Sequence, residues 1–165
     1  MLPVLLGLLG LTITAPETVT PLHLVACAPG YPGTTAQAQP TMDEFAAILG
    51  AAAGWDQGTV SAEYHEDEAA GVARLRDPET QVALVPLPLF FKYEDELQLE
   101  PLAQTVGPDG TAHETWSLVA AAGRVTAPGQ LDGWTVTGVP AYAEPFVRGN
   151  VLGNWGQLPE STDVE

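Results

Sequence analysis

Short apolar runs rich in β-branched residues alternate along the chain with longer stretches of helical spacing. Residues 23–28 (HLVACA), 59–64 (TVSAEY) and 82–85 (VALV) each have the length and composition of a strand. The third run is apolar throughout, as expected of a strand in a parallel sheet with helices on both faces. The alternation therefore predicts an α/β fold built from βαβ units around a mostly parallel sheet.

Helical patterns separate these three predicted strands. Thr41 and Glu44 have the spacing of a capping box, which predicts that the first helix starts there. Phe45, Ile48 and Leu49 follow at i, i+3 and i+4, so we expect them to form the buried face of this helix. An acidic stretch after the second strand leads into a second helix.

The second half of the chain predicts further strands and one more helix. Residues 99–106 (LEPLAQTV) and 114–121 (ETWSLVAA) are interpreted as a fourth and a fifth strand, joined by a turn at 107–110. A short turn and a sixth strand are expected within 131–139, and a helix within 144–152. The remaining residues, 153–165, are polar and turn-rich.

Ligands of open α/β sheets bind beyond the carboxyl ends of the strands. Three predicted loops lie there, at 29–40, 86–91 and 140–144, and they contain hydroxyls, rings and a helix start. Alternative interpretations are ordinary turn chemistry in the first loop and core packing for the alternating Leu87, Leu89 and Phe91. The candidate ligand-binding residues are Tyr31, Thr34, Thr35, Phe90, Tyr93 and Tyr142.

Composition favours a folded and strongly acidic protein. Of 165 residues, 45% are apolar and 16% charged, which is a globular composition. A formal charge of −16 repels phosphate backbones and anionic membrane surfaces, so nucleic acid is excluded as an expected partner. We expect a monomer that needs no cofactor.

The first residues, 1–13 (MLPVLLGLLGLTI), form an uninterrupted apolar run. The run has the length of a signal-peptide core and is shorter than a membrane span of about 20 residues. We therefore expect residues 1–15 to be a leader, residues 16–21 a linker, and the protein to be exported to the periplasm or secreted. A buried N-terminal strand or helix is the alternative.

Motifs for catalysis and metal binding give weaker signals. His65 lies in an acidic stretch, but no second cluster with ligand spacing accompanies it, so we expect no metal site. The sequence contains no G-x-S-x-G and no phosphate-binding glycine pattern. Cys27, the single cysteine, lies inside the first predicted strand and is expected to be buried.

Three segments carry a resemblance to a known family: residues 23–50 (HLVACAPGYPGTTAQAQPTMDEFAAILG), 82–91 (VALVPLPLFF) and 114–140 (ETWSLVAAAGRVTAPGQLDGWTVTGVP). The chain resembles the first part of the phosphate/phosphonate-type solute-binding proteins of ABC transporters, which are two-lobed. The resemblance covers roughly residues 22–152. It implies one lobe at 22–121 and the start of a second, incomplete lobe at 122–165.

The family resemblance implies capture of a small solute between the lobes, without chemistry, and delivery to an ABC permease in the membrane. A secreted enzyme that uses the acidic loop around His65, or a lobe retained as a sensor, remains the alternative. Where oxyanion-binding relatives carry Ser or Thr at the start of the second-lobe helix, this chain has residues 140–144 (PAYAE). A neutral or cationic solute is therefore as compatible with the sequence as a phosphonate.

Overall fold

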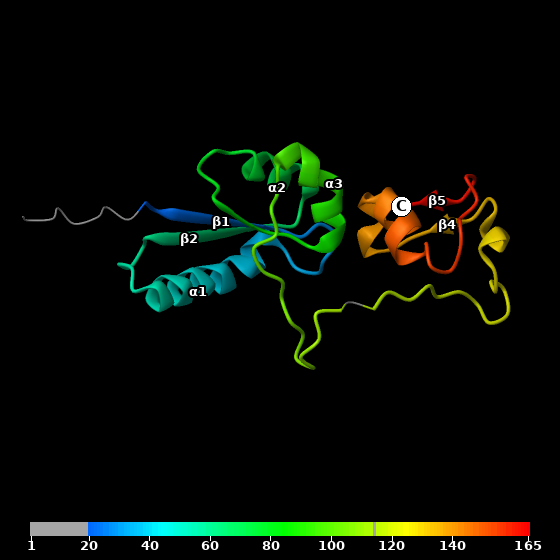
Figure 1. The fold of residues 1–165 in the computed structure, drawn as a ribbon, viewed down its shortest axis with the longest axis horizontal. Coiled ribbons are helices and arrows are strands. Elements are labelled where there is room, and N and C mark those ends of the chain that lie inside the picture. The colour runs from blue at the N-terminus through cyan, green and yellow to red at the C-terminus, as the bar shows by residue number, and fades with distance from the viewer. Residues whose placement is uncertain (1–19, 114) are drawn as a thin grey trace, which may run out of the picture.

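The computed structural model describes residues 20–113 and 115–165, so the predicted leader lies outside the described residues. The first unit is a run of alternating strands and helices, which confirms the α/β prediction (Figure 1). Its elements are β1 (Leu22–Cys27), α1 (Thr35–Ala53), β2 (Val60–His65), α2 (Glu68–Leu75), β3 (Val82–Leu84) and α3 (Leu87–Leu97).

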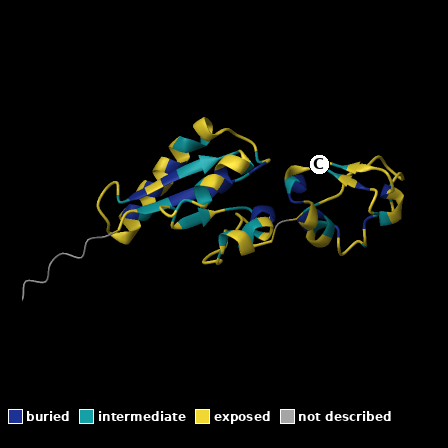
Figure 2. Ribbon diagram, turned by 90° about the horizontal axis from the view of Figure 1, so that it is seen from above, coloured by how far each residue is buried: buried dark blue, intermediate teal, exposed yellow. Residues whose placement is uncertain are grey.

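The three strands form one parallel sheet in the order β2-β1-β3. β1 is central, and its last four residues are buried because helices cover both faces of the sheet. α1 lies on one side of the sheet and α2 and α3 on the other (Figure 1), and buried residues lie along the strands (Figure 2). Leu24 and Ala26 point toward α1, and the alternate residue Cys27 faces α2.

The first helix starts earlier and buries a different face than predicted. Thr34, not Thr41, is its N-cap, and Gln37 completes the capping box. Met42, Ala46 and Gly50 are the buried residues, which follow each other at intervals of four. A β-carbon at Gly50 would lie 3.6 Å from Val60 Cγ2, so small residues allow α1 to lie close to the sheet.

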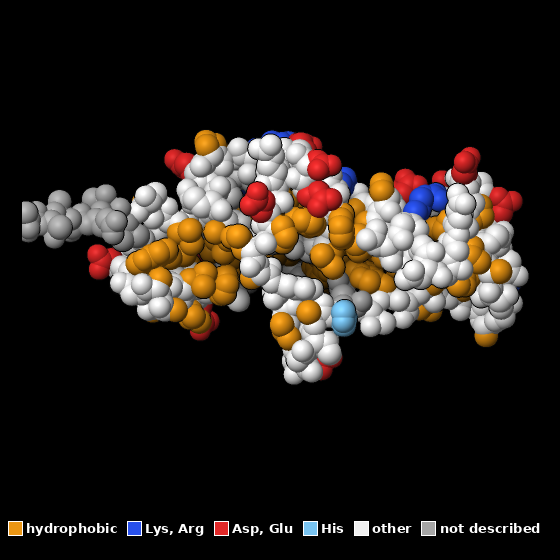
Figure 3. All heavy atoms as spheres, in the orientation of Figure 1, with side chains coloured by type: hydrophobic (Ala, Val, Ile, Leu, Met, Phe, Trp, Pro, Cys, Tyr) orange, Lys and Arg blue, Asp and Glu red, His pale blue; other side chains and the backbone are white. Residues whose placement is uncertain are grey.

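The face of α1 that was predicted to be buried is therefore the wrong one. Phe45 is 37% and Ile48 58% exposed, and only Leu49 packs against the core from its edge. Small residues face the sheet because the helix approaches it closely, and the larger side chains are turned outward. Hydrophobic side chains accordingly gather on the surface of the first unit (Figure 3).

The predicted fourth and fifth strands are absent from the described residues. Residues 99–113 and 115–121 contain no helix or strand, and the first segment includes a turn at 108–110, while Glu114 lies outside the described residues. Pro101 cannot donate a ladder hydrogen bond, which weakens the first of the two segments as a strand. Leu102 is 85% and Val119 87% exposed, so these apolar side chains are not buried as the strand prediction requires.

The chain then forms a second, smaller unit around its own core. Its elements are 3-10 turns at η1 (Pro128–Leu131) and η2 (Val139–Tyr142), the strands β4 (Thr135–Val136) and β5 (Asp163–Val164), the helix α4 (Glu144–Phe146) and its π-helical continuation η3 (Val147–Val151). β4 and β5 pair in parallel, and Leu131, Val147, Leu152 and Leu158 form the core. The predicted sixth strand and last helix are confirmed, and the final residues add β5.

Candidate functional site

The carboxyl end of the parallel sheet faces the second unit, and the loop after β1 and α3 contact that unit. A β-carbon at Gly30, in the loop after β1, would lie 2.8 Å from the carbonyl oxygen of Val139 in η2. The rings of Phe91 in α3 and Phe146 in α4 stack with centroids 5.8 Å apart. Lys92 of α3 donates a hydrogen bond of 2.6 Å to the carbonyl oxygen of Tyr142.

We call this junction the seam and define it by Tyr31, Glu68, Lys92, Tyr93 and Tyr142. Four of these residues come from the loop after β1, from α2 and from α3, beyond the carboxyl ends of the parallel strands, and Tyr142 comes from η2 of the second unit. The seam therefore lies where ligands of open α/β sheets bind.

Tyr142 carries the least satisfied polar group of the seam. Its hydroxyl oxygen is buried and has no hydrogen-bond partner among the described residues. Burial raises the pKa of this hydroxyl, and the neighbouring Tyr31, Cys27 and Glu68 raise it further. The hydroxyl thus remains protonated near neutral pH and can donate or accept a hydrogen bond.

Lys92 is held in a cage of aromatic and anionic groups. Its Nζ lies 2.5 Å from Oε1 of Glu68, and 5.5 Å and 5.6 Å from the ring centroids of Tyr93 and Tyr142. The hydroxyl of Tyr93 donates to the same Glu68 oxygen at 2.6 Å. That hydrogen bond, together with burial, raises the pKa of Tyr93 to about 12. The carboxylate of Glu68 therefore organises both the ring and the ammonium group.

Thr34 and Thr35, two of the predicted binding residues, are engaged at the start of α1. Thr34 caps the helix, and its hydroxyl accepts a hydrogen bond of 3.3 Å from the N–H of Gln37. The N–H and the hydroxyl of Thr35 both donate to Oε2 of Glu66, and these bonds lower the pKa of Glu66. The helix N-terminus thus already holds a carboxylate of the chain itself.

The remaining predicted residues lie at different depths. Tyr31 is half-buried and close enough to Tyr142 to influence its hydroxyl, and Tyr93 belongs to the cage. Phe90 packs edge-on against Phe91 at 5.5 Å, one ring away from the contact between the units. Phe90 and its neighbours form α3 and not a loop, so the predicted loop at 86–91 is wrong beyond Pro86.

Sequence reasoning missed Lys92, Glu68 and Glu66. One signal was available, because Lys92 is the only lysine of the sequence and follows an aromatic pair. Its partners could not be read from spacing, since Glu68 and Tyr142 are 24 and 50 positions away.

A second polar cluster lies on the first two strands, near their amino ends. Ser61 Oγ lies 2.7 Å from Nδ1 of His23, and Nε2 of that ring is 3.4 Å from Glu63, an arrangement with the members of a hydrolase triad. However, Arg74 Nη2 lies 2.8 Å from His23 Nε2, and arginine can only donate. Nε2 is then the acceptor and Nδ1 carries the proton, so His23 cannot take the proton of Ser61.

Glu63 holds this cluster together. Burial alone would raise its pKa, but its hydrogen bonds, the largest from Arg74, lower it below the ordinary value. Arg74 also pairs with Asp77 at 2.5 Å. We interpret the cluster as a structural network that joins α2 to β1 and β2.

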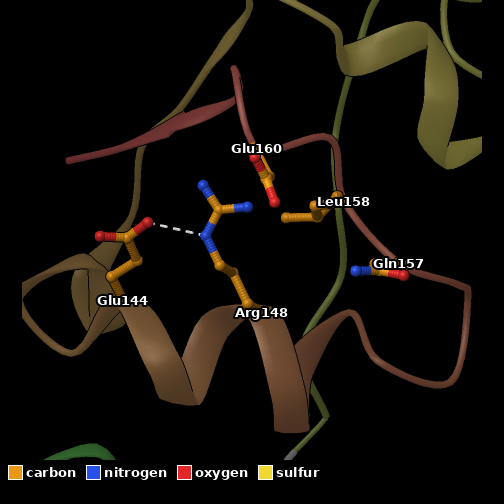
Figure 4. A pocket seen from close by; sticks show the side chains of 5 residues that line it. All are labelled: Glu144, Arg148, Gln157, Leu158 and Glu160. Atoms are coloured by element: carbon orange, nitrogen blue, oxygen red, sulfur yellow. Dashed lines mark hydrogen bonds and ion pairs between the residues drawn. The ribbon is translucent and has the colours of Figure 1, made fainter.

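A cavity of about 370 Å³ lies within the second unit, lined by Glu144, Arg148, Gln157, Leu158 and Glu160 (Figure 4). Arg148 Nε donates to Glu144 at 2.7 Å, and its other nitrogens donate to the carbonyl oxygens of Pro159 and Thr162. The guanidinium therefore holds residues 159–162 against the helical segment that carries Arg148. Since its donors are occupied by the chain, we place the candidate site at the seam.

Residues 20–113 and 115–165 contain no group of three or more potential metal ligands and no helix long and apolar enough to cross a membrane. Comparison of the chain with protein-family models, with curated proteins and with solved structures finds no match.

Proposed function

We propose that the protein is the solute-binding component of an ABC-type uptake system, capturing a small molecule in the seam without chemical conversion and delivering it to a membrane permease. The single observation that carries the proposal is the buried Tyr142 hydroxyl, which has no partner among the described residues. Leaving a buried hydroxyl unpaired costs about 1 to 3 kcal/mol. A solute with a complementary polar group recovers that free energy when it binds.

The arrangement of the two units supports capture by closure. Each unit has a separate hydrophobic core, and residues 98–127 connect them without a helix or strand in their described part. A modest change in the conformation of this connection would alter how closely the units approach. Binding proteins that close around a ligand use hinges of this kind.

A thermal-shift screen of the whole protein tests the proposal. Sugars, amino acids, amines and oxyanions are added separately, and a ligand of the folded state raises the melting temperature with its concentration. Mass spectrometry of each solute after incubation must show it unchanged. Conversion of the solute would favour the enzyme alternative, and the absence of any stabilising solute would contradict the proposal.

Tyr142→Phe tests the site itself. Removal of the hydroxyl is expected to weaken binding of the solute found in the screen by about 5- to 10-fold, the value of one hydrogen bond. Stability without ligand should be unchanged or higher, because the hydroxyl has no partner to lose. Tyr64→Phe on β2 is the matched control and should bind normally. Equal affinity for the parent and Tyr142→Phe would move the site away from Tyr142.

A further inference from the structure

The group that Lys92 places in the seam is itself a primary ammonium. It contacts one carboxylate, one carbonyl oxygen and the faces of two tyrosine rings. Carboxylate and carbonyl oxygens accept hydrogen bonds from N–H donors, and aromatic faces attract cations within about 6 Å of the ring centroid. The cage thus has the chemistry by which proteins recognise an ammonium ion.

We propose that the seam binds a solute carrying a primary ammonium group, which takes the position of the Lys92 ammonium between Glu68, Tyr93 and Tyr142. This inference rests on the proposed function and adds the class of solute. Lys92 then acts as a tethered competitor that fills the cage when no solute is present.

The charges around the seam disfavour an oxyanion. The N-terminus of α1, where an anion would find free N–H groups, is occupied by the carboxylate of Glu66. The ammonium of Lys92 is already paired with Glu68. With a formal charge of −16 the whole protein attracts cations and repels anions. Once Lys92 has moved aside, an ammonium solute meets the carboxylate of Glu68 and, among the described residues of the seam, no positive charge that would repel it.

Displacement of Lys92 is sterically simple. Its side chain remains 33% exposed, and its four-carbon stem is flexible, so the ammonium can turn into solvent. A tethered group competes at an effective concentration in the millimolar range or above. Removing the tether should therefore increase the affinity for a free ammonium ion by at least about 10-fold.

Butylammonium is the appropriate probe because it reproduces the lysine side chain from its β-carbon to Nζ. We compare its binding to the parent, Lys92→Ala and Lys92→Ala/Glu68→Gln by thermal shift, with sodium chloride added to equal ionic strength. Lys92→Ala should bind butylammonium at least about 10-fold more tightly than the parent, and the double variant should lose that gain. Tetramethylammonium, which cannot donate hydrogen bonds, should bind more weakly than butylammonium.

Two further measurements keep the outcome decisive. Lys92→Arg keeps the cage filled and should resemble the parent, and Arg76→Ala, which removes a surface cation paired with Glu96, should not gain affinity. In the isotope-labelled parent, the Lys92 side chain gives the only lysine signal. This signal should move saturably toward the position of a solvated lysine as butylammonium is added, which tests the proposal even if Lys92→Ala does not fold.

The result that overturns the inference differs from the result that overturns the function. If butylammonium binds Lys92→Ala no more tightly than the double variant, or leaves the Lys92 signal of the parent unmoved, the ammonium site is wrong. A sugar or another uncharged solute that binds through Tyr142 would then still support a solute-binding protein. If no solute of any class binds, the proposed function fails with it.

Discussion

At Gly71 the helix α2 lies close to the sheet, and substitution of this residue gives a quantitative test of the packing. A β-carbon at this position would lie 2.8 Å from Cβ of Cys27, still closer to its Sγ, and 3.2 Å from Cβ of His65. Ordinary contacts between such atoms begin near 3.4 Å. Cys27 lies in the central strand with no exposed surface, so neither partner can move freely.

Gly71→Ala should therefore lower the free energy of unfolding. Overpacking a rigid core by one methyl costs about 1 to 3 kcal/mol, and this close contact places the cost at the upper end. Alanine returns about 1 kcal/mol through its higher helix propensity, so the expected net loss is about 2 kcal/mol. Urea unfolding followed by far-ultraviolet circular dichroism measures it, with Ala73→Gly, at an exposed position of the same helix, reporting the propensity term alone.

A double-mutant cycle with Cys27→Ala identifies the contact responsible. Removing Sγ relieves the nearest atom but leaves Cβ, so part of the Gly71→Ala loss should be recovered, with a coupling energy of about 1 kcal/mol or more. If Gly71→Ala is neutral or stabilising, or if the two substitutions are simply additive, α2 does not pack on β1 as described.

Two further predictions concern stability. Burial, followed by the charges of Glu68 and Asp67, raises the pKa of Cys27 to about 11, so the thiol contributes stability fully below pH 9 and loses it as pH rises through 11. Between pH 8 and 11 the free energy of unfolding, measured with urea, should fall less steeply with pH in Cys27→Ala than in the parent. The two slopes should differ by up to the release of about one proton, and equal slopes would contradict a buried thiol. Met42→Ala should cost about 2 to 4 kcal/mol and Ile48→Ala less than about 1 kcal/mol, since only Met42 is buried. If thermal unfolding showed that Ile48→Ala is the more destabilising substitution, the buried face would be the one predicted from the spacing of apolar residues.

The βαβ core was predictable because its signals are local. β1, β2 and β3 each begin within one residue of the predicted position, since short β-branched runs bounded by turn residues determine them. The burial of Cys27 is confirmed for the same reason: a residue inside an apolar central strand is covered from both faces.

Errors arose where the outcome depends on competition between segments. The sequence contains two capping patterns, Thr34 with Gln37 and Thr41 with Glu44, and the earlier one starts α1 although Pro40 then lies inside the helix. Burial of Met42 and the small residues after it against the sheet stabilises this longer helix. Spacing alone cannot choose between two overlapping faces of one helix, because both satisfy the same period.

The seam marks the limit of reading a site from sequence in a chain of this type. The sequence was sufficient to propose Tyr31, Tyr93 and Tyr142, because each ring lies near the predicted end of a strand. Lys92 connects two of these rings and was missed. Its contacts with Glu68 and Tyr142 depend on the parallel topology and on how the two units meet. At Tyr142 the backbone oxygen and the ring are the groups in use, and both favour a cation. A hydroxyl-rich helix start would offer donors, whereas Lys92 requires acceptors. The chemistry of this segment therefore matches the charge of the group it faces, and the ammonium test examines that match directly.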